Sequence, residues 1–321
     1  MAILSPGLPK MDKLDIKIIR ELYQGQQISP LRGGGGGPRE SFRAMGRRLG
    51  VSDGTVRERV ERLTRSGLVK VAPLQLNTNL LGLNMGVLSM DIESSTPKKE
   101  LVERLSLIDG VFLVQTHMGS LVRIAFYYED DMLLQRRVEL MSKIADARSA
   151  KFTRMLFPKS SVSLSRTDWR IVSTLNRNLN SYREISDELQ LSTRTVRRRM
   201  VRMVNGGAIF TYPSSNAEAI REAIMADLFV EYESLRTRQQ VDGMLFELLD
   251  PYYFFAGIWE SYSVYRLILP SIPRSREILG AVRKVRGTKS ARMELIEDRY
   301  EFPGRLYEAL ERKLAALQIA A

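Results

Sequence analysis

The chain has 321 residues, of which 44% are hydrophobic and 27% are charged, a composition typical of a globular protein with several small domains. It contains no cysteine and one histidine, His117, which excludes disulfides, thiolate nucleophiles and histidine-rich metal centres. No apolar run reaches the length of about 18 residues that spans a membrane, and prolines break the short apolar N-terminus. We therefore expect a cytoplasmic protein with no membrane contact, no metal and no cofactor. The formal net charge of +12 points to a polyanionic partner if the charge is gathered in one region.

Three helices are predicted between residues 11 and 73, which we call the N-terminal helical segment. Asp15 is expected to cap the first helix and Ser52 the third, and Gly67 suits a left-handed helix end. Apolar side chains recur at helical spacing in all three: Ile18, Ile19 and Leu22, then Phe42, Met45 and Leu49, then Val56, Val60 and Leu63. The following run LVKVAP is interpreted as a strand or wing, so the segment predicts a winged helix-turn-helix.

Residues 25–40 interrupt this segment with five consecutive glycines, Gly33 to Gly37. The stretch lacks the GK[ST] ending of a phosphate-binding loop and follows no apolar strand. We interpret it as an insertion between the first and second helices. A phosphate contact by Arg32 or Arg39 is an alternative to a plain loop.

Residues 74–158, the first sheet segment, predict the order β-α-β-β-α-β of a ferredoxin-like sandwich. The expected strands are 84–92, 111–117, 121–128 and 150–157, and the expected helices are 98–108 and 130–144. The two helices cover one face of the sheet, and we expect a second domain of the same kind to pack against the other face.

The chain then repeats itself. Residues 165–213, the central helical segment, match the first helices at an offset of 140 residues, pairing Ser52 with Ser192 and Gly67 with Gly207. Residues 214–303, the second sheet segment, again predict β-α-β-β-α-β. Residues 304–321 predict an amphipathic helix that docks on the body of the protein or on a partner chain. The predicted fold class is therefore α+β, with two winged helix-turn-helix domains and two ferredoxin-like domains in tandem.

The positive charge lies in the two helical segments. Residues 12–73 hold 13 basic and 7 acidic side chains, and residues 166–213 hold 9 and 4. Because this surplus coincides twice with a helix-turn-helix pattern, we predict binding to double-stranded DNA rather than simple solvation of helix faces. The N-terminal turns of the third helices would contact bases. The candidate DNA-binding residues are Ser52, Asp53, Thr55, Arg57, Glu58 and Arg62 in the N-terminal segment, and Ser192, Thr193, Arg194, Thr195, Arg197, Arg198 and Arg202 in the central one. Arg59 and Arg199 are expected to bind phosphate or an acidic neighbour.

The runs LDIKIIREL, MGRRLGVSDGTVRERVERLTRSGLV and VQTHMGSLVRIAFYYED resemble the Lrp/AsnC family of transcription regulators. The resemblance covers nearly the whole chain twice and implies a tandem duplication. It further implies sequence-specific DNA binding, transcription regulation, no catalytic residues, and assembly through the sandwich domains into a dimer of pseudo-dimeric chains.

The family also implies a small-molecule effector at the sandwich interfaces. The candidate effector residues lie in the two middle hairpins: Met118, Gly119 and Ser120, and Trp259, Glu260 and Ser261. Gly119 is not followed three residues later by the aspartate found in members that sense amino acids, so plain hairpin turns are the alternative. A second functional class also remains open, because some proteins of similar organisation are siroheme decarboxylases, and His117 lies beside the first hairpin.

Overall fold

The computed structural model describes residues 11–24, 42–69, 74–93, 95–155, 159–175, 182–211, 220, 223–234, 236–259, 262–302 and 304–317. The glycine-rich insertion predicted at 25–40 lies outside these residues. The chain divides into two compact units that do not follow sequence order. Among the described residues, unit 1 combines 11–24, 42–69, 220, 223–234, 236–259 and 262–298, and unit 2 combines 74–93, 95–155, 159–175, 182–211, 299–302 and 304–317.

In unit 1 the N-terminal helical segment forms three helices. They are α1 (Lys13–Gln24), α2 (Phe42–Leu49) and α3 (Asp53–Arg65). The chain enters α1 through a capping box, in which the Asp12 amide donates to the Asp15 carboxylate (3.0 Å) and the Asp15 amide donates to Asp12 (2.9 Å). Asp15, expected to cap this helix, takes part in the cap from the first turn, while Asp12 is the residue that precedes the helix.

The second sheet segment supplies the strands of unit 1. Its elements are β7 (Ile224–Tyr232), α9 (Arg238–Leu249), β8 (Tyr253–Ile258), β9 (Tyr262–Leu269), α10 (Ile272–Arg283) and β10 (Thr288–Glu301). The strands run antiparallel in the order β10-β7-β9-β8, and β10 continues into unit 2 at Arg299.

One apolar core joins these two parts of unit 1, although they lie about 200 residues apart in the sequence. Ile18 of α1, Val56 and Leu63 of α3 pack in the same buried cluster as Phe254 of β8 and Ile268 of β9. The N-terminal helices therefore share a core with the second sheet segment.

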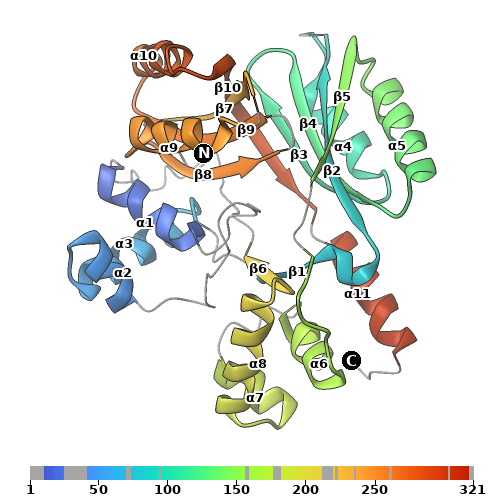
Figure 1. The fold of residues 1–321 in the computed structure, drawn as a ribbon. Helices are drawn as coiled ribbons and strands as arrows, with labels where there is room; N and C mark the ends of the chain where they lie inside the picture. Colours follow the sequence, from blue (N-terminus) through green and yellow to red (C-terminus); the bar gives the residue numbers. More distant parts are fainter. Residues whose placement is uncertain are drawn as a thin grey trace, which may run out of the picture. The chain divides into compact units, whose positions relative to one another are not determined.

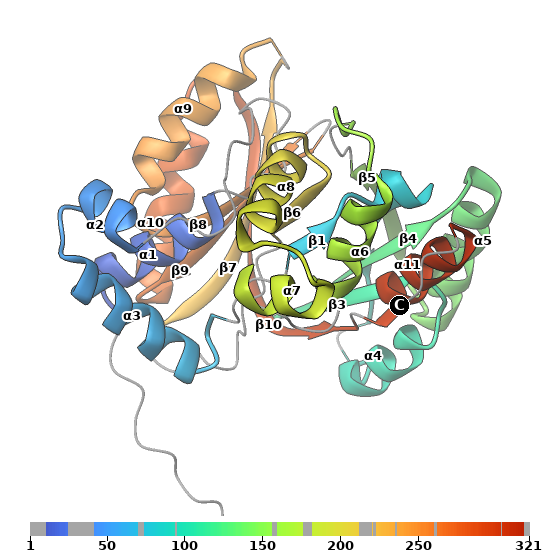
Figure 2. The ribbon, with the colours of Figure 1, turned by 90° about the horizontal axis from the view of Figure 1, so that it is seen from below.

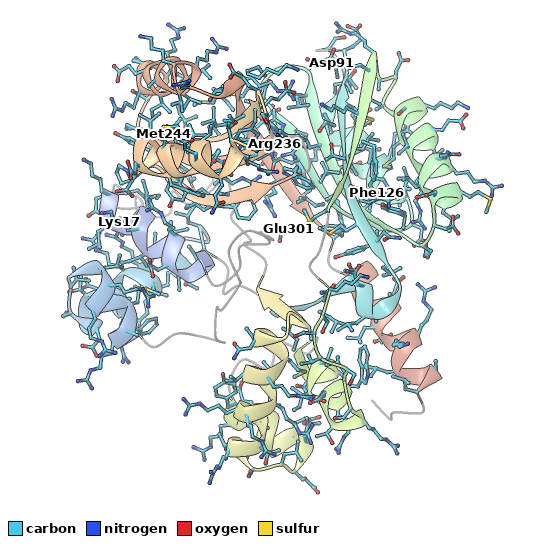
Figure 3. All side chains as sticks on the ribbon, viewed as in Figure 1. Lys17, Asp91, Phe126, Arg236, Met244 and Glu301 are labelled. Atoms are coloured by element: carbon cyan, nitrogen blue, oxygen red, sulfur yellow. The ribbon has the colours of Figure 1, made fainter. Side chains whose placement is uncertain are left out.

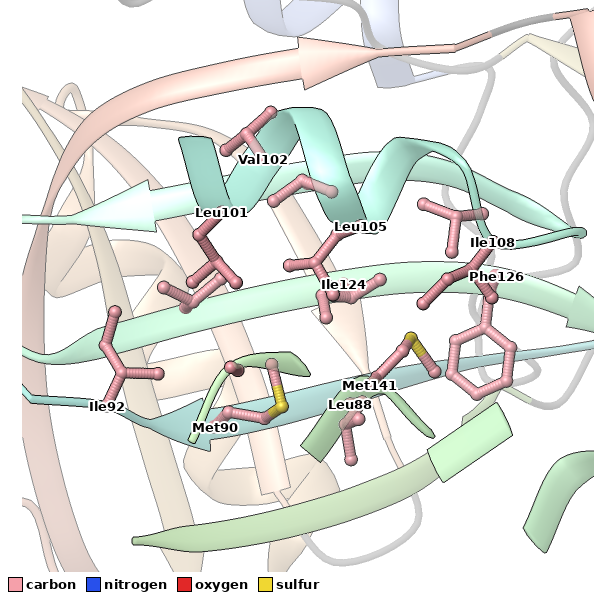
Figure 4. Packing of buried hydrophobic residues seen from close by; sticks show 14 of the residues in the cluster. Leu88, Met90, Ile92, Leu101, Val102, Leu105, Ile108, Ile124, Phe126 and Met141 are labelled. Atoms are coloured by element: carbon pink, nitrogen blue, oxygen red, sulfur yellow. The ribbon is translucent and has the colours of Figure 1, made fainter. Parts of the chain in front are cut away.

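In unit 2 the first sheet segment forms β2 (Asn84–Asp91), α4 (Lys98–Ser106), β3 (Val111–His117), β4 (Leu121–Tyr128), α5 (Asp131–Ile144) and β5 (Ser149–Met155). The strand order is β5-β2-β4-β3, again antiparallel. Alternate strand residues such as Leu88, Met90 and Ile124 face the helices, where they meet Leu105 of α4 and Met141 of α5 (Figure 4). This side of the sheet is an apolar core.

The matching core of the second sheet segment is partly polar. The hydroxyl of Tyr265 donates to the buried Asp242 carboxylate at 2.5 Å, and that of Tyr232 also donates to it. Burial, together with the Asp242 charge, raises the pKa of the Tyr232 phenol, and burial and the neighbouring Tyr232 raise that of Tyr265. Both tyrosines therefore remain protonated hydrogen-bond donors.

The central helical segment of unit 2 forms α6 (Arg166–Leu175), α7 (Tyr182–Leu189) and α8 (Thr193–Asn205). It packs with three further elements: β1 (Leu74–Leu76), the short helix η1 (Thr78–Leu81) and α11 (Gly304–Ala316). The run AIFTYP forms a strand, β6 (Ile209–Thr211), which pairs antiparallel with β1 (Figure 2). Leu310 and Leu314 of α11 are buried in the same core as α6 and α8, so the C-terminal helix docks on this chain as expected.

Figure 1 shows the mixed composition of helices and strands, and the predicted α+β class is confirmed. Most predicted elements appear within two residues of their expected ends. The run LVKVAP, predicted as a strand or wing, lies mostly outside the described residues.

Candidate nucleic-acid interface

The turn between α2 and α3 is built by small residues. The Val51 amide donates to the Gly46 carbonyl at 2.9 Å, and a Cβ added at Gly46 would lie 2.6 Å from the Val51 oxygen. Gly50 takes a left-handed φ of 70°. Ser52 then caps α3, because its Oγ accepts from the Thr55 amide at 3.0 Å. The predicted cap is confirmed, and the start of α3 is rigidly defined.

The turn between α7 and α8 has the same geometry with different residues. The Leu191 amide donates to the Ser186 carbonyl at 3.0 Å, and Gln190 takes the left-handed φ of 52°. Ser192 caps α8 by accepting from the Thr195 amide at 3.1 Å. Gly67 and Gly207 follow the two helices with φ values of 75° and 68°, as predicted from the sequence.

On α3 the predicted base-contacting side chains lie on the outer face. Ser52, Asp53, Arg57 and Glu58 are exposed, Thr55 is half-buried, and Val56 between them is fully buried. The Arg57 guanidinium lies 5.7 Å from the centre of the Phe42 ring of α2. The outer face of α3 therefore mixes hydrogen-bond donors with carboxylate acceptors.

On α8 the corresponding face carries arginines and no carboxylate. Thr193, Arg194, Arg197 and Arg198 are exposed, and Thr195 is half-buried against the cap. Apart from Arg62 and Arg202, the structure thus brings the nominated residues of each helix onto one outer face.

Two arginines of α3 face inward toward α1. Arg59 donates to Asp12 at 2.6 Å and to the fully buried Asp15 at 3.0 Å, and Arg62 also donates to Asp15. Burial disfavours ionisation of Asp12, but the hydrogen bonds from Arg59 and the Asp15 backbone outweigh it and lower the pKa of that carboxyl. The acidic neighbour expected for Arg59 is confirmed.

The central helical segment repeats this pairing. Asp168 of α6 is fully buried and accepts from Arg199 at 3.0 Å and from Arg202 of α8. Burial disfavours its ionisation, but hydrogen bonds from Ser165, Arg199 and the charge of Arg202 lower the pKa of the Asp168 carboxyl overall. Arg62 and Arg202, nominated for DNA binding, therefore fasten the third helix of their segment to the first. Contact of either with DNA remains a prediction.

Arginines on α2 were not singled out by the sequence reasoning. Arg43 and Arg47 are exposed at i and i+4, so they share one face of the helix, and neither forms an ion pair with another described residue. Arg48 differs, since it pairs with Glu21 of α1 at 2.5 Å. The absence of any carboxylate from FRAMGRRL was the signal that could have identified this basic face.

Arg20 anchors α1 on β8 within unit 1. Its Nε donates to the Tyr253 carbonyl at 3.0 Å, its Nη1 lies 2.7 Å from Asp250, and its guanidinium lies 3.9 Å from the centre of the Tyr253 ring. A cleft of about 510 Å³ opens beside this anchor, lined in part by Lys17 of α1 (Figure 3) and Phe246 of α9. The anchor fixes α1, and through the Arg59 and Arg62 ion pairs it fixes α3.

The effector candidates are partly described. Met118 is 64% exposed and Gly119 has a φ of 109°, which fits a tight hairpin between β3 and β4. Trp259 is buried and stacks on Tyr262 with 6.0 Å between ring centres. Glu260 and Ser261 lie outside the described residues, so effector binding at these hairpins stays a prediction.

His117 is fully buried at the end of β3. Its Nε2 lies 2.9 Å from the Gln115 amide nitrogen, and its backbone carbonyl accepts from Lys98 at 2.7 Å. Within the described ranges, no group of three His, Asp or Glu side chains is placed to hold a metal ion. Among the helices that the structure describes, none is both long and apolar enough to cross a membrane.

Comparison with known proteins identifies the domain type of the N-terminal helices. Residues 11–64 match the AsnC-type helix-turn-helix domain. The HTH-type transcriptional regulator Ptr1 of Methanocaldococcus jannaschii is 36% identical over 107 residues, which are 33% of this chain and 64% of Ptr1. The chain therefore matches less than two thirds of that relative.

Two solved structures align with the chain over different lengths. The siroheme decarboxylase NirDL is 13% identical, with a TM-score of 0.50 over 95% of this chain and 99% of its own. The AsnC protein of E. coli is 19% identical, with a TM-score of 0.31 over 49% of this chain and 97% of its own. At this identity the NirDL match shows a shared fold alone.

Proposed function

We propose that the protein is a sequence-specific, double-stranded DNA-binding transcription regulator of the Lrp/AsnC type. The observation that carries this proposal is the match of residues 11–64 to the AsnC-type helix-turn-helix domain. The similarity to the regulator Ptr1 supports it. The local geometry agrees, because α3 begins at a capped, exposed N-terminus, which is the part of such a helix that contacts base edges.

The proposal extends to a second helix-turn-helix in α6, α7 and α8. The support is local: Ser192 caps α8 as Ser52 caps α3, and Asp168 binds Arg199 and Arg202 as Asp15 binds Arg59 and Arg62. On this view the chain arose by tandem duplication and carries two DNA-binding helices, which an ordinary member obtains by pairing two chains.

The direct test is a footprint on duplexes selected from a randomised pool by the intact protein. Two protected major-groove sites separated by about 34 Å, or a multiple of it, are expected if both helices bind one face of the duplex. Protection at one site, or two sites out of helical phase, would contradict the two-site arrangement. No selection of any duplex would contradict the function itself.

Assembly and regulation are parts of the same proposal. We expect chains to associate through the sheet segments and a small molecule to bind at the middle hairpins around Met118 and Trp259. Light scattering of the purified chain with and without DNA tests the first expectation, and a single-chain mass under both conditions would contradict it. Loss of effector response in Met118→Ala, with DNA binding retained, would support the second.

A siroheme decarboxylase is the second candidate, favoured by the fold shared with NirDL over almost the whole of both chains. A tetrapyrrole enzyme must place polar groups against its substrate, and the histidine considered for that role is fully buried beside Gln115. Mixing the purified protein with siroheme and recording the visible spectrum separates the candidates. A shifted Soret band with product formation supports the enzyme; an unchanged spectrum with retarded DNA supports the regulator.

A further inference from the structure

The two helical segments distribute their charge in opposite ways between their second and third helices. In the N-terminal segment, α2 carries Arg43, Arg47 and Arg48 with no carboxylate. In the central segment, α7 has the sequence YREISDEL, with one arginine against three exposed carboxylates, Glu184, Asp187 and Glu188. The second helix is therefore basic in one segment and acidic in the other.

The third helices show the reverse. On the exposed face of α3, Arg57 and Arg65 are outnumbered by Asp53, Glu58 and Glu61. On α8 the exposed charges are all positive, with Arg194, Arg197 and Arg198 clear of the ion pair to Asp168. The ion-paired arginines do not change this contrast, because in both segments two arginines of the third helix bind a buried aspartate of the first helix.

These positions have different partners on DNA. The second helix of a helix-turn-helix crosses the sugar-phosphate backbone, and the third lies in the major groove. Arginine on the second helix therefore meets phosphates, which carry no sequence information. Arginine in the groove meets guanine O6 and N7, while a carboxylate there accepts from the amino group of cytosine and is repelled by phosphates.

We propose, on the basis of the proposed function, that the two segments divide the work of DNA recognition. Arg43 and Arg47 of α2 bind phosphates and hold the N-terminal segment on any duplex. Arg194, Arg197 and Arg198 of α8 bind guanines and confine the central segment to a guanine-rich half-site. The recognised sequence is therefore asymmetric.

The acidic face of α7 sharpens this division. Its carboxylates would lie toward the phosphates that flank the groove, where like charges repel. The central segment would then bind poorly unless α8 finds its guanines. The N-terminal segment would not depend on such base contacts by α3, because the arginines of α2 already hold it on the phosphates.

The test compares two double variants on two duplexes, the preferred sequence selected by the wild-type chain and a scrambled sequence of equal length. Arg43→Gln with Arg47→Gln is expected to weaken binding to both duplexes equally. It should reduce the slope of log affinity against log salt by about two, near 0.9 for each lost phosphate contact. Arg197→Gln with Arg198→Gln is expected to lower the ratio of preferred to scrambled affinity by at least about fivefold. Arg136→Gln, on the exposed face of α5, is a control that removes one positive charge outside the two helical segments.

Replacing guanine by 7-deazaguanine in the half-site protected by the central segment removes the N7 acceptor. The substitution should weaken the wild-type chain and the α2 variant more than the α8 variant, in which Arg194 is the remaining guanine-binding arginine. An α2 variant that loses the sequence preference, or an α8 variant that keeps it, would overturn the division of work. If the wild-type chain selects no duplex, the proposed function itself fails.

Discussion

The N-terminal and central helical segments share their internal contacts and differ in their outer faces. Each has a serine cap on its third helix, a left-handed residue before that cap, and a buried aspartate that binds two arginines. The shared contacts all lie inside a segment, where a change would leave a buried charge or a strained turn. The exposed faces, free of these constraints, have opposite charge patterns. The comparison teaches that the contacts that hold each segment together and the exposed faces proposed to bind DNA use different residues of the same helices.

The largest expected effect is on the shared buried pair. Asp168→Ala leaves Arg199 and Arg202 without their carboxylate, and Asp15→Ala does the same to Arg59 and Arg62. Breaking a fully buried pair costs about 3–5 kcal/mol, and we expect about 2–3 because the arginines are partly exposed. Urea unfolding followed by fluorescence measures this, with Trp169, buried in α6, as the local reporter in a Trp259→Phe background. Asp187→Ala, which removes an exposed carboxylate, is the control. An equal loss of unfolding free energy in Asp187→Ala would show that the buried aspartates have no special role in stability.

A second, smaller effect concerns the outer faces. Arg197→Ala is expected to weaken binding to the preferred duplex by about 1–3 kcal/mol, and Arg198→Ala is expected to do the same. Arg57→Ala occupies the corresponding place on α3 and should cost less, because Glu58 and Glu61 already offset its charge. Gel retardation over a range of salt concentrations measures both. A larger loss for Arg57→Ala than for Arg197→Ala would reverse the comparison.

Lowering the pH should weaken the same ion pairs of Asp168 that Asp168→Ala removes, with a smaller loss of unfolding free energy. The pKa of Asp168 is lowered in the folded chain, so the folded state binds its proton more weakly than the unfolded state does. The contribution is therefore complete above the ordinary aspartate pKa of about 3.9 and is lost as pH falls through the lower folded value. Urea midpoints between about pH 5 and pH 3 should fall more steeply for the wild type than for Asp168→Asn. Parallel curves would assign the acid sensitivity to other groups.

The smallest expected effect lies in the turns. Gly50 and Gln190 occupy the same left-handed position, which costs little for glycine and more for glutamine. Gln190→Gly should stabilise the central segment by less than about 1 kcal/mol, and Gly50→Gln should destabilise the N-terminal one by a similar amount. Thermal unfolding of both variants checks the sign. Destabilisation by Gln190→Gly would mean that the glutamine side chain makes a contact that outweighs its backbone strain.

Several features followed from sequence patterns because their causes are local. Ser52 and Ser192 were predicted as caps, and Gly67 and Gly207 as left-handed helix ends, since each depends on neighbours a few residues away. The strands β2, β3 and β4 were placed nearly to the residue from their apolar runs. The alternation of apolar and polar residues also marked the outer faces of α3 and α8.

Other features needed the tertiary structure. The pairing of Asp15 with Arg62 spans 47 residues, and nothing in the spacing distinguished Arg62 from the exposed Arg57 as the one that turns inward. The role of Asp12 in the capping box was missed because Asp12 and Asp15 are both good capping residues.

The sequence by itself determined the helices and strands, their caps and the unequal charge of the two helical segments, because these depend on residue type and short spacing. Only the tertiary structure decided which surfaces meet. The sequence holds two similar helical segments and two similar sheet segments, and each apolar face fits more than one partner by composition. Long-range packing selected Phe254 and Ile268, rather than the adjacent first sheet segment, as partners for Ile18 and Val56. It likewise paired β6 with β1 across more than a hundred residues. Such choices depend on shape complementarity in three dimensions, which no local pattern encodes.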